Sequence, residues 1–123
     1  MADYIPLFKP GQAITRPVAT TAVVGGRLVE VNGVGTVGPA GAASTAVLGV
    51  AAFDAAVGEN VTVHAGGVQR LTASAAITAG GLVSAAAAGK CAAIGAGVFG
   101  TLVGMALTTA ANDGDVIEVS MFR

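Results

Sequence analysis

The chain has 123 residues and a mass of 11.7 kDa, a size that fits one domain with at most an appended arm. Six Lys and Arg residues against seven Asp and Glu residues give a net charge of −1, with no basic cluster to neutralise phosphates, so nucleic-acid binding is not expected. A single Cys and a single His exclude an internal disulfide and a Cys/His zinc site within one chain.

Alanine and glycine, with 27 and 19 copies, dominate the composition, whereas Trp is absent and only five residues are aromatic. A core is therefore expected, but a thin one built mostly from valine and alanine. Much of the stability is expected to come from contacts with neighbouring chains.

The first seventeen residues predict an extended arm, because prolines at positions 6, 10 and 17 fix φ and disfavour helix. This segment contains two of the five aromatic residues and begins without the basic and apolar stretches of a secretory signal. We expect the arm (residues 1–17) to dock on a partner or on its own domain (residues 18–123). The candidate docking residues are Tyr4, Ile5, Leu7 and Phe8.

Beyond the arm, short β-prone runs alternate with glycines. Alternation predicts a strand over Arg27–Val31, and a turn at Asn112–Asp115 leads into a last strand, Val116–Phe122. Gly66-Gly67 lies between two further runs and predicts a hairpin with a two-residue turn. These signals favour an all-β fold, a small β-barrel or a β-sandwich-like domain.

An internal repeat indicates two similar β-units, over about 20–65 and 75–120. At a shift of 55 residues Ala46–Ala51 matches Thr101–Ala106, and the Gly-Gly pair at 25–26 lies over the pair at 80–81. The same shift places Asp54 over Thr109, each followed by Ala-Ala.

No motif predicts catalysis, a metal or a cofactor. The G-x-G-x-x-G pattern at Gly33–Gly38 is followed by Pro-Ala-Gly rather than a helix start, so a flexible loop is expected there. His64 is expected to face solvent on a strand, and Cys91 to be a small buried filler. Asp113 and Asp115 predict a tight turn, with a weak calcium contact as the alternative. We predict that the protein is not an enzyme.

Three uncharged runs are long enough to span a bilayer, Val31–Phe53, Leu71–Gly89 and Cys91–Asn112. They consist largely of Ala, Gly, Ser and Thr and lack flanking basic residues, so no membrane interaction is expected.

The order of motifs over residues 10–120 resembles the small capsid cement, or head decoration, proteins of tailed bacteriophages. The segments that carry the resemblance are Pro10-Gly11, Gly49–Val63, Gly67-Val68, Ile77–Val83 and Gly104–Ala106. The Gly-Gly at 80–81, where the family pattern has Gly-Asp, is a mild departure.

The resemblance implies a β-rich protein of the virion, made in the host cytoplasm and placed on the outer capsid surface. It further implies a homotrimer that clamps neighbouring major capsid protein subunits, without catalytic residues. Two alternatives remain open at this point. One is a small carbohydrate-binding or adhesion module, and the other is a membrane-active Gly/Ala-rich protein built on Cys91–Asn112.

Overall fold

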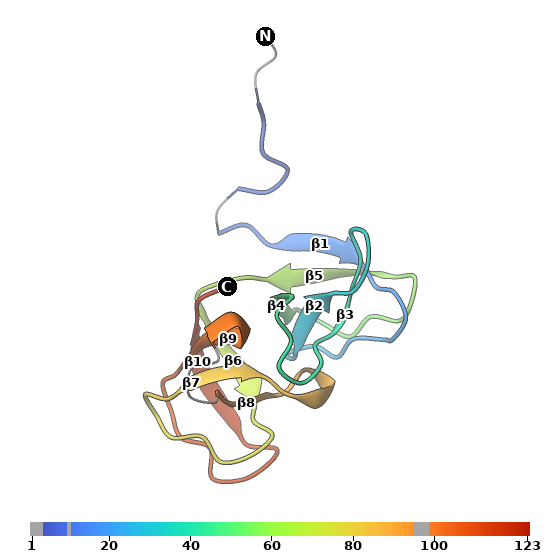
Figure 1. Cartoon of the computed structure of the whole chain (residues 1–123). Helices are drawn as coiled ribbons and strands as arrows, with labels where there is room; N and C mark the ends of the chain where they lie inside the picture. The colour runs from blue at the N-terminus through green and yellow to red at the C-terminus, as the bar shows by residue number, and fades with distance from the viewer. Residues whose placement is uncertain (1–3, 10, 95–98) are drawn as a thin grey trace.

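The computed structural model describes residues 4–9, 11–94 and 99–123. Within these residues the chain forms two five-stranded antiparallel sheets, which confirms the all-β prediction (Figure 1). Neither sheet closes into a barrel, so of the two predicted forms the sandwich-like one is observed. The first sheet contains β1 (Ile14–Pro17), β2 (Leu28–Val31), β3 (Val37–Pro39), β4 (Val47–Ala51) and β5 (Asn60–His64). The second contains β6 (Val68–Thr72), β7 (Leu82–Ala85), β8 (Cys91–Ala93), β9 (Leu102–Ala106) and β10 (Val116–Met121), with 3₁₀ turns η1 (Ala87–Gly89) and η2 (Phe99–Thr101).

The two sheets have the same topology, which confirms the predicted pair of similar units. The N-terminal unit (residues 14–64) has the strand order β1-β5-β4-β2-β3, and the C-terminal unit (residues 68–121) has the order β6-β10-β9-β7-β8. Both carry a bulge at the same place, between Val29 and Glu30 in β2 and between Val83 and Ser84 in β7. Two units that share even this irregularity have the same fold.

One detail of the predicted repeat is wrong by a residue. The sequence match places Gly25-Gly26 over Gly80-Gly81. The hydrogen bonds show instead that Gly26 of the N-terminal unit is equivalent to Gly80 of the C-terminal unit. The Gly26 N–H donates to Ala51 and the Gly80 N–H to the equivalent Ala106. Both glycines have positive φ, +79° and +87°, a conformation that other residues rarely adopt. The turn geometry therefore fixes the correspondence.

The predicted hairpin around Gly66-Gly67 is also wrong. β5 pairs with β1 and β4 in the first sheet, whereas β6 pairs with β10 in the second. Gly66-Gly67, both with positive φ, is instead the link between the two units. The Gly66 N–H donates to the Arg123 carbonyl and the Gly67 carbonyl accepts from Met121, so the link is held by the C-terminal end of the chain.

The same eight positions are buried in each unit, and in the C-terminal unit they belong to a larger cluster that also contains residues of the N-terminal unit. In the N-terminal unit these are Val18, Val23, Val29, Val37, Ala51, Ala55, Val61 and Val63. Their equivalents in the C-terminal unit are Ala73, Ile77, Val83, Cys91, Ala106, Ala110, Ile117 and Val119. Cys91 thus fills the place of a valine, as the filler prediction requires, and burial raises its pKa to about 11.

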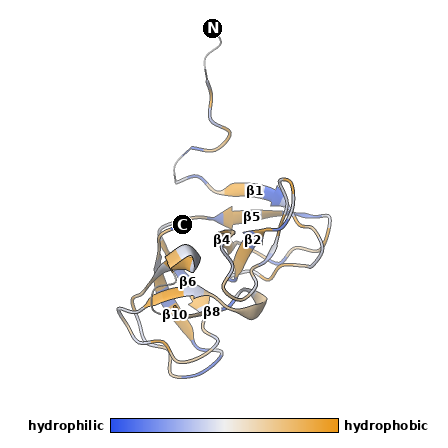
Figure 2. Cartoon of the chain, in the orientation of Figure 1, coloured by the Kyte–Doolittle hydropathy of each residue, from blue (hydrophilic) through white to orange (hydrophobic). Residues whose placement is uncertain are grey.

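The predicted last strand is present as β10, with its alternate residues Ile117, Val119 and Met121 buried. The strands are mostly hydrophobic in Figure 2, whereas the connecting loops are mixed. No helix among the described residues is long and apolar enough to cross a membrane. The described part of Cys91–Asn112 instead contains β8, η2 and β9.

Candidate functional site

The N-terminal segment leads away from the two sheets (Figure 1). Of the expected arm, Ile14–Pro17 is β1 and pairs with β5, so residues 4–9 and 11–13 are the described part outside the sheets. Tyr4, Ile5 and Leu7 are exposed by 88%, 79% and 84%. Large apolar side chains in water favour a partner that would bury them.

Phe8, the fourth predicted docking residue, is placed differently, because it is half-buried over the N-terminal unit. It lines a cavity of about 290 Å³ whose walls come from strands β1 to β4. The lining residues are Phe8, Ile14, Arg16, Val31, Gly35, Thr36, Val37 and Leu48. The structure therefore keeps the predicted docking residues in one segment but separates Phe8, at the base, from the three exposed side chains.

The glycine-rich motif Gly33–Gly38 covers most of the connection between β2 and β3 and the first two residues of β3. The chain thus enters a strand within the motif, where a dinucleotide site has the N-terminus of a helix. The Asn32 side-chain amide donates to the Ala19 carbonyl at 2.8 Å, and Asn32 Oδ1 accepts from the Thr36 hydroxyl at 2.8 Å, so side chains brace this loop. The motif shapes a β-connection.

The carboxylates expected in turns are engaged in holding those turns. Asp115 Oδ2 accepts the N–H groups of Ala111 and Asn112 at 2.9 and 3.0 Å. Glu59, its equivalent in the N-terminal unit, accepts the N–H of Ala56 at 2.7 Å.

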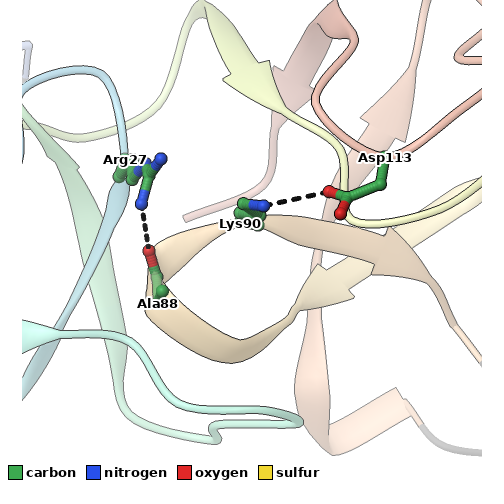
Figure 3. Close-up of polar contacts among 4 residues, drawn as sticks. All are labelled: Arg27, Ala88, Lys90 and Asp113. Carbon is green, nitrogen blue, oxygen red and sulfur yellow. Dashed lines mark hydrogen bonds and ion pairs between the residues drawn. The ribbon is translucent and has the colours of Figure 1, made fainter.

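Asp113 forms an ion pair of 2.9 Å with Lys90, which connects the turn before β10 to the loop before β8 (Figure 3). His64, as predicted, is exposed at the end of β5. Among the described residues no three His, Cys, Asp or Glu side chains gather into a group that could hold a metal ion.

Sequence reasoning missed a second apolar surface, which we call the C-terminal apolar face. It consists of Leu82, Ile94, Leu102 and Met105. The first three are half-buried and Met105 is 36% exposed, although the equivalent positions of the N-terminal unit are fully buried. Sequence alone gives no signal for this difference, because both sets of residues are apolar.

Comparison with known proteins gives a family and a fold. The sequence profile of a family described as phage cement protein matches residues 8–121. A solved structure, the head fiber gp8.5 N base of bacteriophage phi29, superposes with a TM-score of 0.71 at 18% sequence identity, over 89% of this chain and 92% of that one. No match is found among curated proteins.

Proposed function

Because the chain belongs to the phage cement protein family, a family of phage capsid structural proteins, we propose that it decorates the outside of the capsid and cements contacts between major capsid protein subunits. The match over residues 8–121 carries this proposal. The role is structural and needs neither a catalytic residue nor a cofactor. The protein is made in the host cytoplasm and becomes part of the outer surface of the virion.

The proposed capsid contact is the arm, residues 1–17, with Tyr4, Ile5, Leu7 and Phe8 as docking residues. The exposure of the first three leaves their apolar surface available for burial. Each such side chain contributes roughly 1.5–3 kcal/mol when fully buried, before the cost of ordering the segment. The family profile begins at Phe8, so Tyr4, Ile5 and Leu7 precede the matched region.

The protein is further proposed to act as a homotrimer. Three copies would carry three arms, and engaging several capsid subunits at once turns modest single contacts into strong overall binding. The small Val/Ala cores of the two units agree with a protein that gains stability from its neighbours.

The test compares decoration of purified empty capsids by the full chain and by a chain without residues 2–12, which keeps β1 intact. A second variant, Tyr4→Ser/Ile5→Ser/Leu7→Ser, removes only the exposed apolar groups. The matched control replaces three exposed apolar residues of the body, Val24→Ser/Val57→Ser/Leu107→Ser. Co-sedimentation with capsids measures binding, and circular dichroism measures folding.

We expect both arm variants to fold as β-rich proteins and to lose decoration by at least tenfold, whereas the control binds like the full chain. Undiminished decoration by the arm variants would mean that the body makes the capsid contact. Failure of the full chain to sediment with capsids would refute the cement function itself.

A further inference from the structure

The two units of one chain contact each other through different surfaces. The C-terminal unit contributes the β7–β8 loop (residues 86–90), and the N-terminal unit contributes the region around the start of β2 and the end of β3. The Gly89 N–H donates to the Ala40 carbonyl at 2.9 Å, and Arg27 Nη1 donates to the Ala88 carbonyl at 3.4 Å (Figure 3). The apolar residues of the N-terminal unit that this contact buries are Leu28, Ala40, Val47 and Val50, which share one cluster with residues of the C-terminal unit.

Because the two units have the same fold, the C-terminal unit has a counterpart of the apolar surface that the N-terminal unit buries in this contact, and the N-terminal unit has a counterpart of the β7–β8 loop. The equivalents of Leu28, Ala40, Val47 and Val50 form the C-terminal apolar face. The strand pairs fix this match: Leu28 lies opposite Val50, and Leu82 lies opposite Met105. Likewise the N–H of Ala40 donates to Leu28, and that of Ile94 donates to Leu82.

The C-terminal apolar face is larger than its buried counterpart. Ala40 is replaced by Ile94, Val47 by Leu102 and Val50 by Met105, while leucine is kept at position 82. The N-terminal set is at most 6% exposed, whereas Met105 is 36% exposed. Larger apolar side chains with more exposure favour a partner that covers this face.

The complementary surface on the N-terminal unit is the β2–β3 loop (residues 32–36), the counterpart of the β7–β8 loop. It has the same length, and Gly35 and Gly89 have φ of +73° and +74°. Its flank Val31 is 44% exposed where its counterpart Ala85 is 3% exposed, and Val34 is fully exposed.

Next to this loop lies the cavity of about 290 Å³. Its walls include Val31, Val37 and Leu48. The equivalents of these three residues, Ala85, Cys91 and Val103, belong to the buried cluster that contains Leu28, Val47 and Val50. The cavity is therefore the unfilled counterpart of the space between the two units.

We propose that a second copy of this chain docks here and repeats the internal contact: the β2–β3 loop and cavity of one copy receive the C-terminal apolar face of the next. The Gly35 N–H of one copy would donate to the Ile94 carbonyl of the other, as Gly89 donates to Ala40 within the chain. The bond from Arg27 is not repeated, because its counterpart is Gly81, and the larger apolar side chains take its place. This inference names the residues of the self-association proposed above.

The contact is heterologous, since the two copies use different surfaces, and such contacts form rings or open chains. In a homotrimeric ring the internal and intermolecular contacts would alternate around six similar units. The geometry thus predicts a property that distinguishes it from a two-fold contact: position 34 of one copy faces position 82 of another, and never position 34.

Two single variants, Val34→Cys and Leu82→Cys, test this without capsids, so the outcome does not depend on capsid binding. Each variant alone, and an equal mixture of both, is treated with a short bismaleimide and analysed by denaturing electrophoresis. Native Cys91 is buried and its pKa is raised to about 11, which keeps its thiol out of the reaction. We expect dimers in the mixture and at most traces in each variant alone.

Sedimentation velocity supplies the second measurement. Val34→Asp and Met105→Lys should each weaken self-association at least tenfold, while Val57→Asp, a charge at an exposed valine outside both surfaces, leaves it unchanged. Circular dichroism of each variant verifies the fold. A wild-type protein that stays monomeric at its highest soluble concentration, efficient cross-linking of Val34→Cys with itself, or unchanged assembly of Val34→Asp would each overturn the proposal.

Discussion

Replacing Gly104 by alanine should destabilise the protein strongly, and Gly49→Ala should do the same in the other unit. Gly104 lies in β9, directly beside β10. A Cβ atom there would overlap the Ser120 carbonyl oxygen and lie 2.9 Å from Val119 Cγ1 and 3.1 Å from the Ser120 carbonyl carbon. At Gly49 a Cβ would meet the His64 carbonyl oxygen and lie 2.9 Å from Val63 Cγ1.

The cost follows from what blocks the new atom. The obstacle is backbone, so the two strands have to separate rather than a side chain moving aside. Overpacking of this kind costs about 1–3 kcal/mol, and weakening one ladder hydrogen bond adds roughly 0.5–1.5 kcal/mol. A loss of about 2–4 kcal/mol in the free energy of unfolding is expected, from a total of roughly 5–15 kcal/mol for a typical domain.

Urea unfolding followed by circular dichroism measures this loss. The matched control is Gly100→Ala, four residues before Gly104, because a Cβ at Gly100 has no atom within 4 Å and its φ is not positive. The control should stay within about 0.5 kcal/mol of the wild type. If Gly104→Ala and Gly100→Ala unfold at the same urea concentration, the reasoning about strand spacing is refuted.

Two further predictions concern single side chains. Asp54 accepts the Gly25 N–H at 2.8 Å, and its equivalent Thr109 accepts the Ala79 N–H at 3.1 Å. Asp54→Ala should therefore lower the free energy of unfolding, measured by urea titration, by about 1–2 kcal/mol, and Asp54→Thr by clearly less. Equal losses for the two variants would show that the side-chain acceptor is unimportant. Burial raises the pKa of Cys91 from 9.0 to about 11, so above pH 9 the unfolded thiol ionises while the folded one stays protonated. The buried thiol of Cys91 should therefore lower the free energy of unfolding by about 2 kcal/mol as the pH rises from 9 to 11. Urea titrations of the wild type and of Cys91→Val across that range measure this loss as a change in the difference between their unfolding free energies. A difference that stays constant with pH would contradict the prediction.

The strand content could be read from the sequence because alternation and turn chemistry are local. β10 follows the Asn112–Asp115 turn, and its buried residues alternate as expected. Strand pairing is not local, which explains the error at Gly66-Gly67. Two strands joined by two glycines look like a hairpin whether they pair with each other or, as here, with β1 and β10.

The two candidate surfaces also differ in whether local sequence signals indicate them. An extended N-terminal segment could be expected, because prolines restrict the backbone of a short stretch of sequence, whereas its role in docking stays a prediction. The C-terminal apolar face could not, since Leu28 and Leu82 occupy the same place in two similar units and differ only in what covers them. Leu28 is fully buried by the other unit, and Leu82 is half-buried. That difference arises from how one unit packs on the other, which the sequence of neither unit contains.

The arm and the proposed subunit contact meet at one place. Phe8, at the base of the arm, lines the same cavity as Val31 and Gly35, where the second copy is proposed to dock. A docked copy would therefore contact Phe8 and fix the direction in which the exposed part of the arm leaves the body. Because an arm held in one direction loses less entropy on binding than a free one, self-association would strengthen capsid binding beyond the gain from having three arms. The two proposals are thus linked through a single side chain.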